Sequence, residues 1–396
     1  MKRLILSPAV VGLLCAAGLA APPVPTFKKI QLSDKFYAEG AYYADFNRDG
    51  KMDVVAGPWW FEGPDFKVKH EIRPPQAFDP HGYSDNFLTY TGDFNGDGWP
   101  DVLYVGYPGK EVYWYETPGA KGGPWKKHLA LRDVGNESPM WADVNGDGRP
   151  ELIYNNNGQL GYGTYDPAKP EQEWVFHPVT PKDAKYFCYT HGVGWGNIAG
   201  KGRIDLVDKG GWWEQPADPQ AATWIYHPYH FADEGAQMLV YDVDGDGLAD
   251  VITTWHAHGY GLVWHKQVRN SKGEISFEKH EILPTKPDLK SPALRISQMH
   301  ALDLVDMNGD GLKDVLTGKR FWAHGPGGDA EPAAPAVLYW FELRRDAQKG
   351  VEFIPHKIDD DSGVGTQVTA VDLNGDGIPD PIVANKKGIF IFLSQK

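Results

Sequence analysis

An acidic nine-residue pattern recurs six times along the chain. Oxygen-bearing side chains stand at positions 1, 3, 5 and 9, and a glycine stands at position 6. Such oxygens around a tight turn are the ligands that a hard cation such as Ca²⁺ requires. An apolar pair such as Val54-Val55 follows each pattern, which indicates a strand rather than the helix of an EF-hand. The sequence therefore predicts up to six structural Ca²⁺ sites.

The predicted Ca²⁺ ligands are Asp45, Asn47, Asp49, Asp53, Asp93, Asn95, Asp97, Asp101, Asp143, Asn145, Asp147, Glu151, Asp242, Asp244, Asp246, Asp250, Asp306, Asn308, Asp310, Asp314, Asp372, Asn374, Asp376 and Asp380. A seventh copy, 197–205, keeps Gly202 and Asp205 but has Ala199 and Lys201 at positions 3 and 5. Because the Lys201 ammonium would occupy the place of a cation, we expect no metal there. The copies start about 45 to 66 residues apart, which indicates a repeat architecture.

Each repeat has the same order of predicted strands. An apolar strand precedes the acidic turn, a second follows it, and then come an aromatic strand such as Val112–Glu116 and a strand ending in histidine, such as 125–128. Four short strands per repeat are typical of one propeller blade. The last repeat has three, and the segment Phe27–Leu32 resembles the missing fourth. We therefore expect an all-β fold over residues 22–396: a seven-bladed β-propeller with four-stranded antiparallel blades, closed by the N-terminal strand.

Most histidines follow the repeat. One recurs on the outermost predicted strand of six repeats: His70, His128, His177, His227, His280 and His356. A residue that appears once per blade is expected to serve the packing of the blade, and the aromatic residues of the third strand are expected to do the same.

A second group of polar residues differs from repeat to repeat. It lies just before the first strand or just after the second, which places it at the opposite end of the strands from the acidic turns. Such residues converge around the mouth of the central channel, where a site can be built on a symmetric scaffold. His191, His256, His258 and His300 belong to this group and would suit a transition metal such as Zn²⁺. The alternative is that they only bond loops or a ligand.

Further residues of the same rim are expected to act on a substrate. For proton transfer and charge stabilisation the predicted residues are His191, His300, Tyr260, Lys319 and Arg320. For contacts with the substrate, including aromatic stacking on sugar faces, they are Trp59, Trp60, Glu137, Trp255, Trp322, His324 and His81.

Composition narrows the partners and the compartment. The formal net charge of −14 argues against nucleic acid or an anionic membrane as a partner, and the acidic turns account for much of it. Lys2-Arg3 followed by the apolar run Leu4–Ala20 predicts a signal peptide over 1–21 and hence an exported protein without a membrane span. Only Cys188 remains after cleavage, so no intramolecular disulfide can form and bound Ca²⁺ would stabilise the fold instead.

The acidic turns with their flanking strands resemble FG-GAP/VCBS repeats, the family of the calcium-binding blades of integrin α-subunit propellers. Four further segments resemble the propeller domain of aldos-2-ulose dehydratases: Thr190–Gly196, Gly211–Pro216, His258–His265 and Thr317–His324. That resemblance implies dehydration of a keto-sugar and a metal in the propeller.

Three functions are compatible with these patterns. The first is a metal-assisted lyase or dehydratase acting on a sugar. The second is a non-catalytic module that binds a glycan or a protein on the same rim. The third, a quinone-dependent sugar dehydrogenase, ranks last because no pattern specific to a quinone is present. Metal content separates the first two, since calcium alone favours binding and an additional zinc-like ion favours chemistry.

Overall fold

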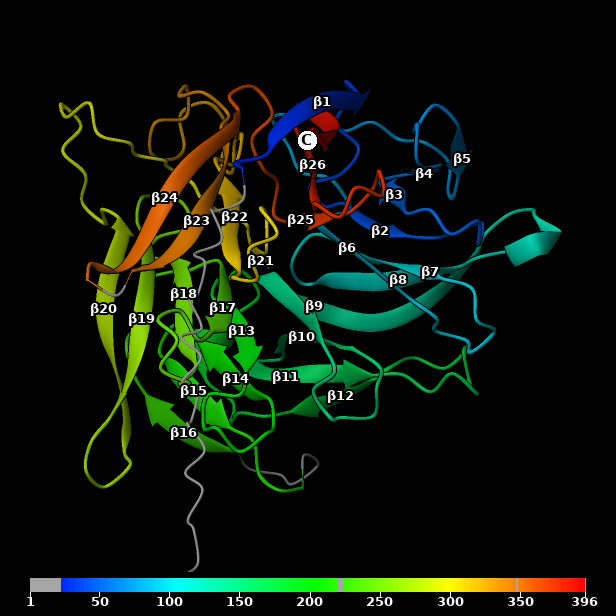
Figure 1. The fold of residues 1–396 in the computed structure, drawn as a ribbon. Coiled ribbons are helices and arrows are strands. Elements are labelled where there is room, and N and C mark those ends of the chain that lie inside the picture. Colours follow the sequence, from blue (N-terminus) through cyan, green and yellow to red (C-terminus); the bar gives the residue numbers. More distant parts are fainter. Residues whose placement is uncertain (1–22, 219–223, 347, 396) are drawn as a thin grey trace, which may run out of the picture.

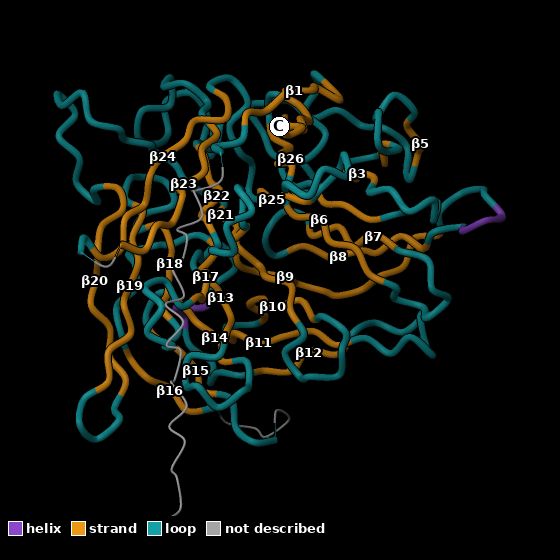
Figure 2. Tube along the Cα trace, in the orientation of Figure 1, coloured by secondary structure: helices purple, strands orange, loops and turns teal. Residues whose placement is uncertain are grey.

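The computed structural model describes residues 23–218, 224–346 and 348–395, so the predicted signal peptide lies outside the described residues. The described chain is almost entirely strand and loop (Figure 2), with two short 3-10 helices, η1 (Gly119–Lys121) and η2 (Ala184–Tyr186). None of the helices in these ranges has the length and apolarity needed to cross a bilayer. The fold is therefore all-β and built from antiparallel strand pairs.

The strands of the described residues fall into seven four-stranded units, in the order of the predicted repeats. Unit one contains β2 (Tyr42–Ala44), β3 (Asp53–Ala56), β4 (Trp59–Phe61) and β5 (Lys69–Glu71). Unit two contains β6 (Leu88–Gly92), β7 (Asp101–Val105), β8 (Lys110–Glu116) and the first part of β9 (Lys126–Ala142). Unit three contains the rest of β9 with β10 (Glu151–Asn156), β11 (Gln159–Thr164) and β12 (Val175–Pro178).

Unit four contains β13 (Val193–Gly196), β14 (Asp205–Asp208), β15 (Gly211–Glu214) and β16 (Ile225–Pro228), and unit five contains β17 (Gln237–Tyr241), β18 (Asp250–Thr254), β19 (Leu262–Arg269) and β20 (Ile275–Leu283). Unit six contains β21 (Leu302–Val305), β22 (Asp314–Gly318), β23 (Leu338–Asp346) and β24 (Gly350–Asp359). Unit seven contains β25 (Val368–Val371), β26 (Asp380–Asn385), β27 (Gly388–Gln395) and β1 (Thr26–Ser33). The N-terminal strand β1 pairs antiparallel with the last strand β27, from Thr26 opposite Gln395 onward.

Two pairs of units are fused into larger sheets, which the repeat pattern did not predict. Strand β9 serves units two and three, and β13 pairs in parallel with β17 across units four and five. Glycines explain the second fusion, because a Cβ on Gly194 would lie 1.9 Å from the Met238 carbonyl oxygen and one on Gly196 would lie 2.4 Å from the Val240 Cβ. Without those side chains the two innermost strands approach closely enough to pair.

Apolar clusters lie between successive units in the described residues. For example, Tyr104 and Tyr115 of unit two pack with Val55 of unit one. One cluster joins the two ends of the series, since Val54 of unit one packs with Ile382 and Ile391 of unit seven. Figure 1 shows the units following one another around the molecule in chain order, with β1 beside the C-terminus.

Each acidic turn joins the first and second strands of its unit, and its residues have two different tasks. In the turn between β6 and β7, Asp93 accepts the backbone amides of Asp97 and Gly98, at 3.1 and 2.8 Å. The residue at position nine, Asp101, is fully buried and accepts the amides of Phe94 and Thr117, each at 2.9 Å. Position nine thus ties the turn to the end of the third strand.

The degenerate seventh copy shows what its residue at position nine, Asp205, contributes to the structure. Asp205 accepts the amides of Ala199 and Gln215, at 2.8 and 2.9 Å. This contact pattern matches that of Asp101, although the copy lacks acidic residues at positions 3 and 5. Position nine therefore has a structural role that does not depend on a cation.

The repeated histidines pack against the aromatic strand, as expected. The His128 ring stacks on Trp114 with centroids 4.0 Å apart, and its Nε2 lies 2.8 Å from the Glu116 carboxylate. His70 on Trp60 and His227 on Trp212 repeat the 4.0 Å stacking. These residues stabilise the outer edge of each unit.

Candidate metal centre

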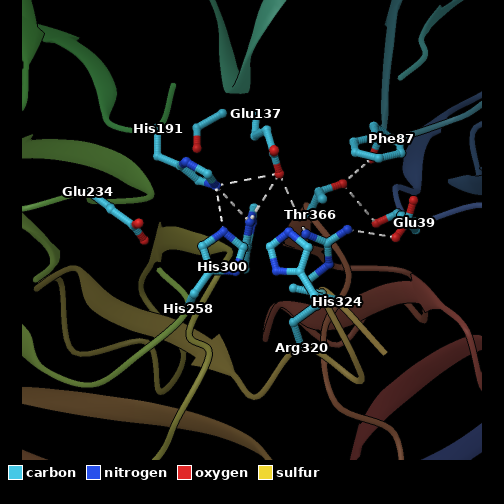
Figure 3. Close-up of polar contacts among 12 residues, drawn as sticks. Glu39, Phe87, Glu137, His191, Glu234, His258, His300, Arg320, His324 and Thr366 are labelled. Carbon is cyan, nitrogen blue, oxygen red and sulfur yellow. Dashed lines mark hydrogen bonds and ion pairs between the residues drawn. The ribbon is translucent and has the colours of Figure 1, made fainter. Parts of the chain in front are cut away.

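The residues that lie six positions before each acidic turn come together at one end of the innermost strands. The Thr366 amide donates to the Glu39 carbonyl oxygen at 3.0 Å, and the Thr366 hydroxyl donates to the carbonyl oxygen of Phe87. Glu137, His191 and His300 belong to the same set (Figure 3). Because β13 and β21 run between this set and their acidic turns, the two kinds of site lie at opposite strand ends, about 20 Å apart along the chain.

Three imidazoles and one carboxylate converge at this end. The His191 Nε2 lies 3.1 Å from the Nε2 of His300 and 3.1 Å from that of His258. One carboxylate oxygen of Glu137 lies 3.4 Å from the Nε2 atoms of both His191 and His300. In Figure 3 these four groups face one another. The four atoms lie within 4.8 Å of one another.

This donor set fits a metal ion. The Nε2 of His191 has three acceptor-type neighbours and can donate a proton to only one of them, so direct hydrogen bonds do not account for the arrangement. Ligands around a tetrahedral Zn²⁺ with bonds of about 2.0–2.2 Å are separated by about 3.3 Å, close to the distances seen. Three histidines and a carboxylate are also ligand types that Zn²⁺ accepts.

The four groups sit in a largely dehydrated place. His300 is fully buried, and Glu137 exposes 13% of its side chain. Burial lowers the pKa of His300 and of His258, which favours the neutral imidazole that a metal binds. Burial alone would raise the pKa of Glu137, but the hydrogen bonds from His191 and His300 hold it well below its usual range. The Glu137 carboxyl is thus ionised, as a carboxylate ligand of a metal must be.

An aspartate that the sequence analysis missed supports this centre from outside. Asp329 lies in the long loop between β22 and β23, with its Oδ1 3.5 Å from the Nδ1 of His258. The same oxygen lies 2.9 Å from the Nδ1 of His324. Carboxylates commonly orient metal-binding histidines in this way. Asp329 belongs to no repeat and lies in a Gly- and Pro-rich loop, so no spacing pointed to it.

His256 and His324, both predicted for the rim, lie outside the convergence. The His256 Nδ1 lies 2.9 Å from the Glu234 carboxylate, which the sequence analysis also missed. Burial would raise the pKa of Glu234, but the bond from His256 holds it at about 2. His324 is exposed, with its ring 4.5 Å from that of His258. His256 therefore makes an ion pair of its own, while His324 borders the centre.

The predicted charged residues lie close to the centre in different settings. Arg320 is buried, donates to Glu39 at 2.7 Å and lies 3.7 Å from Glu137. Lys319 is buried as well, and its ammonium donates to the Ser297 hydroxyl at 3.3 Å. Burial lowers the pKa of Lys319 to about 8.

Tyr260 is tied down in another way. Its hydroxyl donates to Glu331 at 3.0 Å. Burial, and to a smaller extent the Glu331 carboxylate, raises the pKa of the Tyr260 hydroxyl to about 12. A phenol in this state is a poor proton acceptor near neutral pH.

The prediction that Trp59 and Trp60 stack on a sugar is wrong. Both lie in β4 and are only 8% exposed, because they are the aromatic third strand of unit one and fill the apolar layers on either side of it. Trp255 and Trp322 are half-buried, and the exposed His81 ring lies 5.7 Å from Trp322. Three tyrosines form an aromatic group at the mouth instead. The Tyr107 ring packs on Tyr83 with centroids 5.3 Å apart and on Tyr189 with centroids 5.8 Å apart.

Two of the six acidic turns bring three carboxylates together, as expected for a cation site. The carboxylates of Asp143, Asp147 and Glu151 lie within 4.8 Å of one another, as do those of Asp242, Asp244 and Asp246. In the second of these turns the Lys266 ammonium contacts Asp244 and Asp246. A cation there would have to displace this lysine.

Comparisons with known proteins identify one segment. Residues 93–154, which contain the second and third acidic turns, match the FG-GAP-like repeat family. No curated protein matches the chain.

Three solved structures are similar in fold. An Agrocybe aegerita lectin that recognises non-reducing terminal N-acetylglucosamine is 16% identical, with 86% of this chain and 82% of that chain covered and a TM-score of 0.48. The structure of BBS1N in complex with ARL6DN is 11% identical, with 94% and 97% covered and a TM-score of 0.49. The Photorhabdus luminescens Tc holotoxin pore is 16% identical, with 95% and 15% covered and a TM-score of 0.40.

Proposed function

We propose that the chain is an exported, calcium-stabilised seven-bladed propeller that carries one transition-metal ion at the mouth of its channel and acts as a lyase on a keto-sugar. The observation that carries this proposal is the convergence of Glu137, His191, His258 and His300. Four potential ligands, one from each of the successive units three to six, meet at a single point. The six histidines that stack on aromatic strands recur at one position of the repeat, and these three histidines lie elsewhere.

Two contacts support the closed ring. The apolar clusters between successive units include one between the first and last units, where Val54 packs with Ile382. In addition, β1 completes the last unit by pairing with β27, so the two ends of the described chain meet in one sheet. A closed ring of blades around a channel is the arrangement that these contacts favour.

The chemistry follows from the donor set and its neighbours. A bound Zn²⁺ would act as a Lewis acid towards a carbonyl oxygen. An elimination removes a proton from the carbon next to that carbonyl and expels a hydroxyl group as water. His324 is the histidine best placed to exchange this proton, because it is exposed, lies beside His258 and is oriented by Asp329. Arg320 holds Glu39 and Glu137 in place.

Metal analysis of the purified protein tests the proposal. We expect about one zinc-like ion per chain beyond calcium in the wild type, and loss of that ion in His258→Gln and His300→Gln. His256→Gln is the matched control, because it removes a rim histidine that makes an ion pair outside the convergence. Since His300 is fully buried, circular dichroism must show that its variant is folded, and the half-buried His258 gives an independent reading. Equal zinc content in all four proteins would contradict the proposed centre.

A non-catalytic glycan-binding module is the second candidate function. It is favoured by the aromatic side chains at the mouth, of which Tyr189 is 44% exposed, because such rings stack on sugars without any metal. A wild-type protein that contains calcium but no zinc-like ion and still binds glycans would support this candidate instead.

A further inference from the structure

Two lysines occupy matching places in neighbouring units. Lys319 directly follows β22, the second strand of unit six, and Lys386 directly follows β26, the second strand of unit seven. Their exposed fractions are 1% and 6%. A buried ammonium group is uncommon unless a carboxylate or another anion lies beside it.

Neither lysine has such an anion among the described residues. The Lys319 ammonium makes one hydrogen bond within the described residues, to the Ser297 hydroxyl. Lys386 forms no hydrogen bond or ion pair with the part of the chain that the structure describes, and its ammonium lies 4.9 Å from the Tyr83 ring centroid and 6.0 Å from that of Phe36. Cation–π contacts offset only a part of the cost of dehydrating a charge.

The carboxylates nearby are already engaged by other groups. Glu39 accepts from Arg320 at 2.7 Å, and Glu331 lies 2.9 Å from Arg295. Asp329 is bonded to His324 at 2.9 Å. The two lysines are therefore the positive charges of this region without a matching acid in the described chain.

Neighbouring residues connect both lysines with the surroundings of the proposed metal centre. Lys319 is adjacent in sequence to Arg320, whose guanidinium lies 3.7 Å from Glu137. Lys386 rests on Tyr83, which packs against Phe87 at 5.9 Å within the converging set. Burial lowers the pKa of both lysines to about 8, and the charge of Asp329 acts on both, which is consistent with their closeness to that loop. Perturbed pKa values of this kind gather at functional sites.

We propose that the mouth binds a sugar acid, with the carboxylate of the ligand held by Lys319 and Lys386 while the sugar ring faces the metal centre and the tyrosines Tyr83 and Tyr107. The ligand would supply the anion that the two lysines lack. This inference deepens the proposed sugar-lyase function and rests on it for the role of the ligand as substrate.

Calorimetry with matched sugar pairs tests the inference. The probes are D-glucuronate, D-galacturonate, D-mannuronate and L-guluronate, each compared with its neutral parent sugar, which differs only in carrying a hydroxymethyl group in place of the carboxylate. We expect at least one acid to bind at least ten-fold more tightly than its parent. Lys319→Met and Lys386→Met should each reduce that preference several-fold, whereas the exposed Lys121→Met, which changes the net charge equally, should leave it intact.

The outcomes separate this inference from the proposed metal centre. If no uronate binds more tightly than its neutral parent, or if Lys121→Met reduces the preference as much as the two buried substitutions, the inference is overturned. Zinc content measured on the same preparations decides the metal centre independently. A preference for acids that persists in zinc-free protein would leave the lysine site standing and remove the metal from the proposal.

Discussion

One position of the repeat carries side chains that differ between the units, and its copies lie at the same end of the innermost strands. Six positions before each acidic turn, the chain has Glu39, Phe87, Glu137, His191, Ala236, His300 and Thr366. The symmetry of the units brings this slot together at one end, and its variation in side chain makes a donor set out of three of its members. His258 completes the set from the loop after β18.

The buried lysines should make the stability of the protein depend on pH. Their folded-state pKa of about 8 lies below the ordinary value of 10.5, so between these pH values the unfolded chain holds more protons than the folded chain. The free energy of unfolding attributable to Lys319 and Lys386 therefore rises as the pH rises from about 8 to about 10.5, and the cost of burying both charges is fully present at pH 7.

Replacement by methionine should remove that cost. We expect Lys319→Met and Lys386→Met each to raise the free energy of unfolding at pH 7, by about 1 to 3 kcal/mol, because a shift of one pKa unit corresponds to about 1.4 kcal/mol. The gain should shrink as the pH approaches 10.5. Urea denaturation of wild type and variants between pH 7 and 10.5 measures it. A loss of stability in both variants at pH 7 would mean that the lysines are structurally paired.

At the scale of elements, each acidic turn combines a proposed cation site with backbone contacts that hold its unit together. Positions one, three and five gather oxygens at the surface, while position nine is buried against backbone amides. The degenerate copy lacks the acidic residue at position five but keeps the buried contacts of position nine, as Asp205 shows. Calcium affinity and hairpin geometry can therefore change separately.

Two substitutions in one turn should separate these functions. Asp101→Asn places an amide group against two backbone N–H donors, and we expect it to lower the free energy of unfolding by about 1 to 3 kcal/mol in calcium and in EGTA alike. Asp97→Asn, at the exposed position five, should matter only in calcium. Denaturation curves in both buffers measure the two effects. An effect of Asp101→Asn confined to calcium would reduce position nine to a metal ligand.

At the scale of the whole molecule, β1 fastens the first segment of the described chain to the last. Lys29 forms a 2.8 Å ion pair with Asp359 of β24, and Ile30 packs against the cluster between units seven and one. This strand therefore contacts two neighbouring units as well as its pairing partner β27.

Ile30→Asp should open this fastening. It puts a charge on the half-buried face of β1, and we expect the free energy of unfolding to fall by about 2 to 4 kcal/mol. Lys28→Asp places a carboxylate at an exposed position of the same strand, two residues earlier, and should stay within about 0.5 kcal/mol of wild type. Thermal and chemical denaturation compare the two. Similar small effects would show that the inner face of β1 contributes little to the packing.

Much of the fold could be predicted because the repeat is written in local patterns. The acidic turns, the strand pairs around them and the histidines stacked on aromatic residues all depend on contacts within about fifty residues. The rim histidines could be predicted as a group because strand direction decides which strand ends meet. Trp59 and Trp60 misled the sequence analysis because the spacing did not distinguish a third strand from the connection before it.

By itself the sequence determined the repeat, the acidic turns and the end of the strands at which His191 and His300 lie. Only the tertiary structure decided that Glu137 joins their donor set, that His258 enters it while His256 pairs with Glu234, and that Asp329 lies behind His258. It also decided that Lys319 and Lys386 are buried without an acid in the described chain. The physical reason is that these contacts join loops of different units, whose separation in space depends on how the units pack and not on the spacing of residues within any one of them.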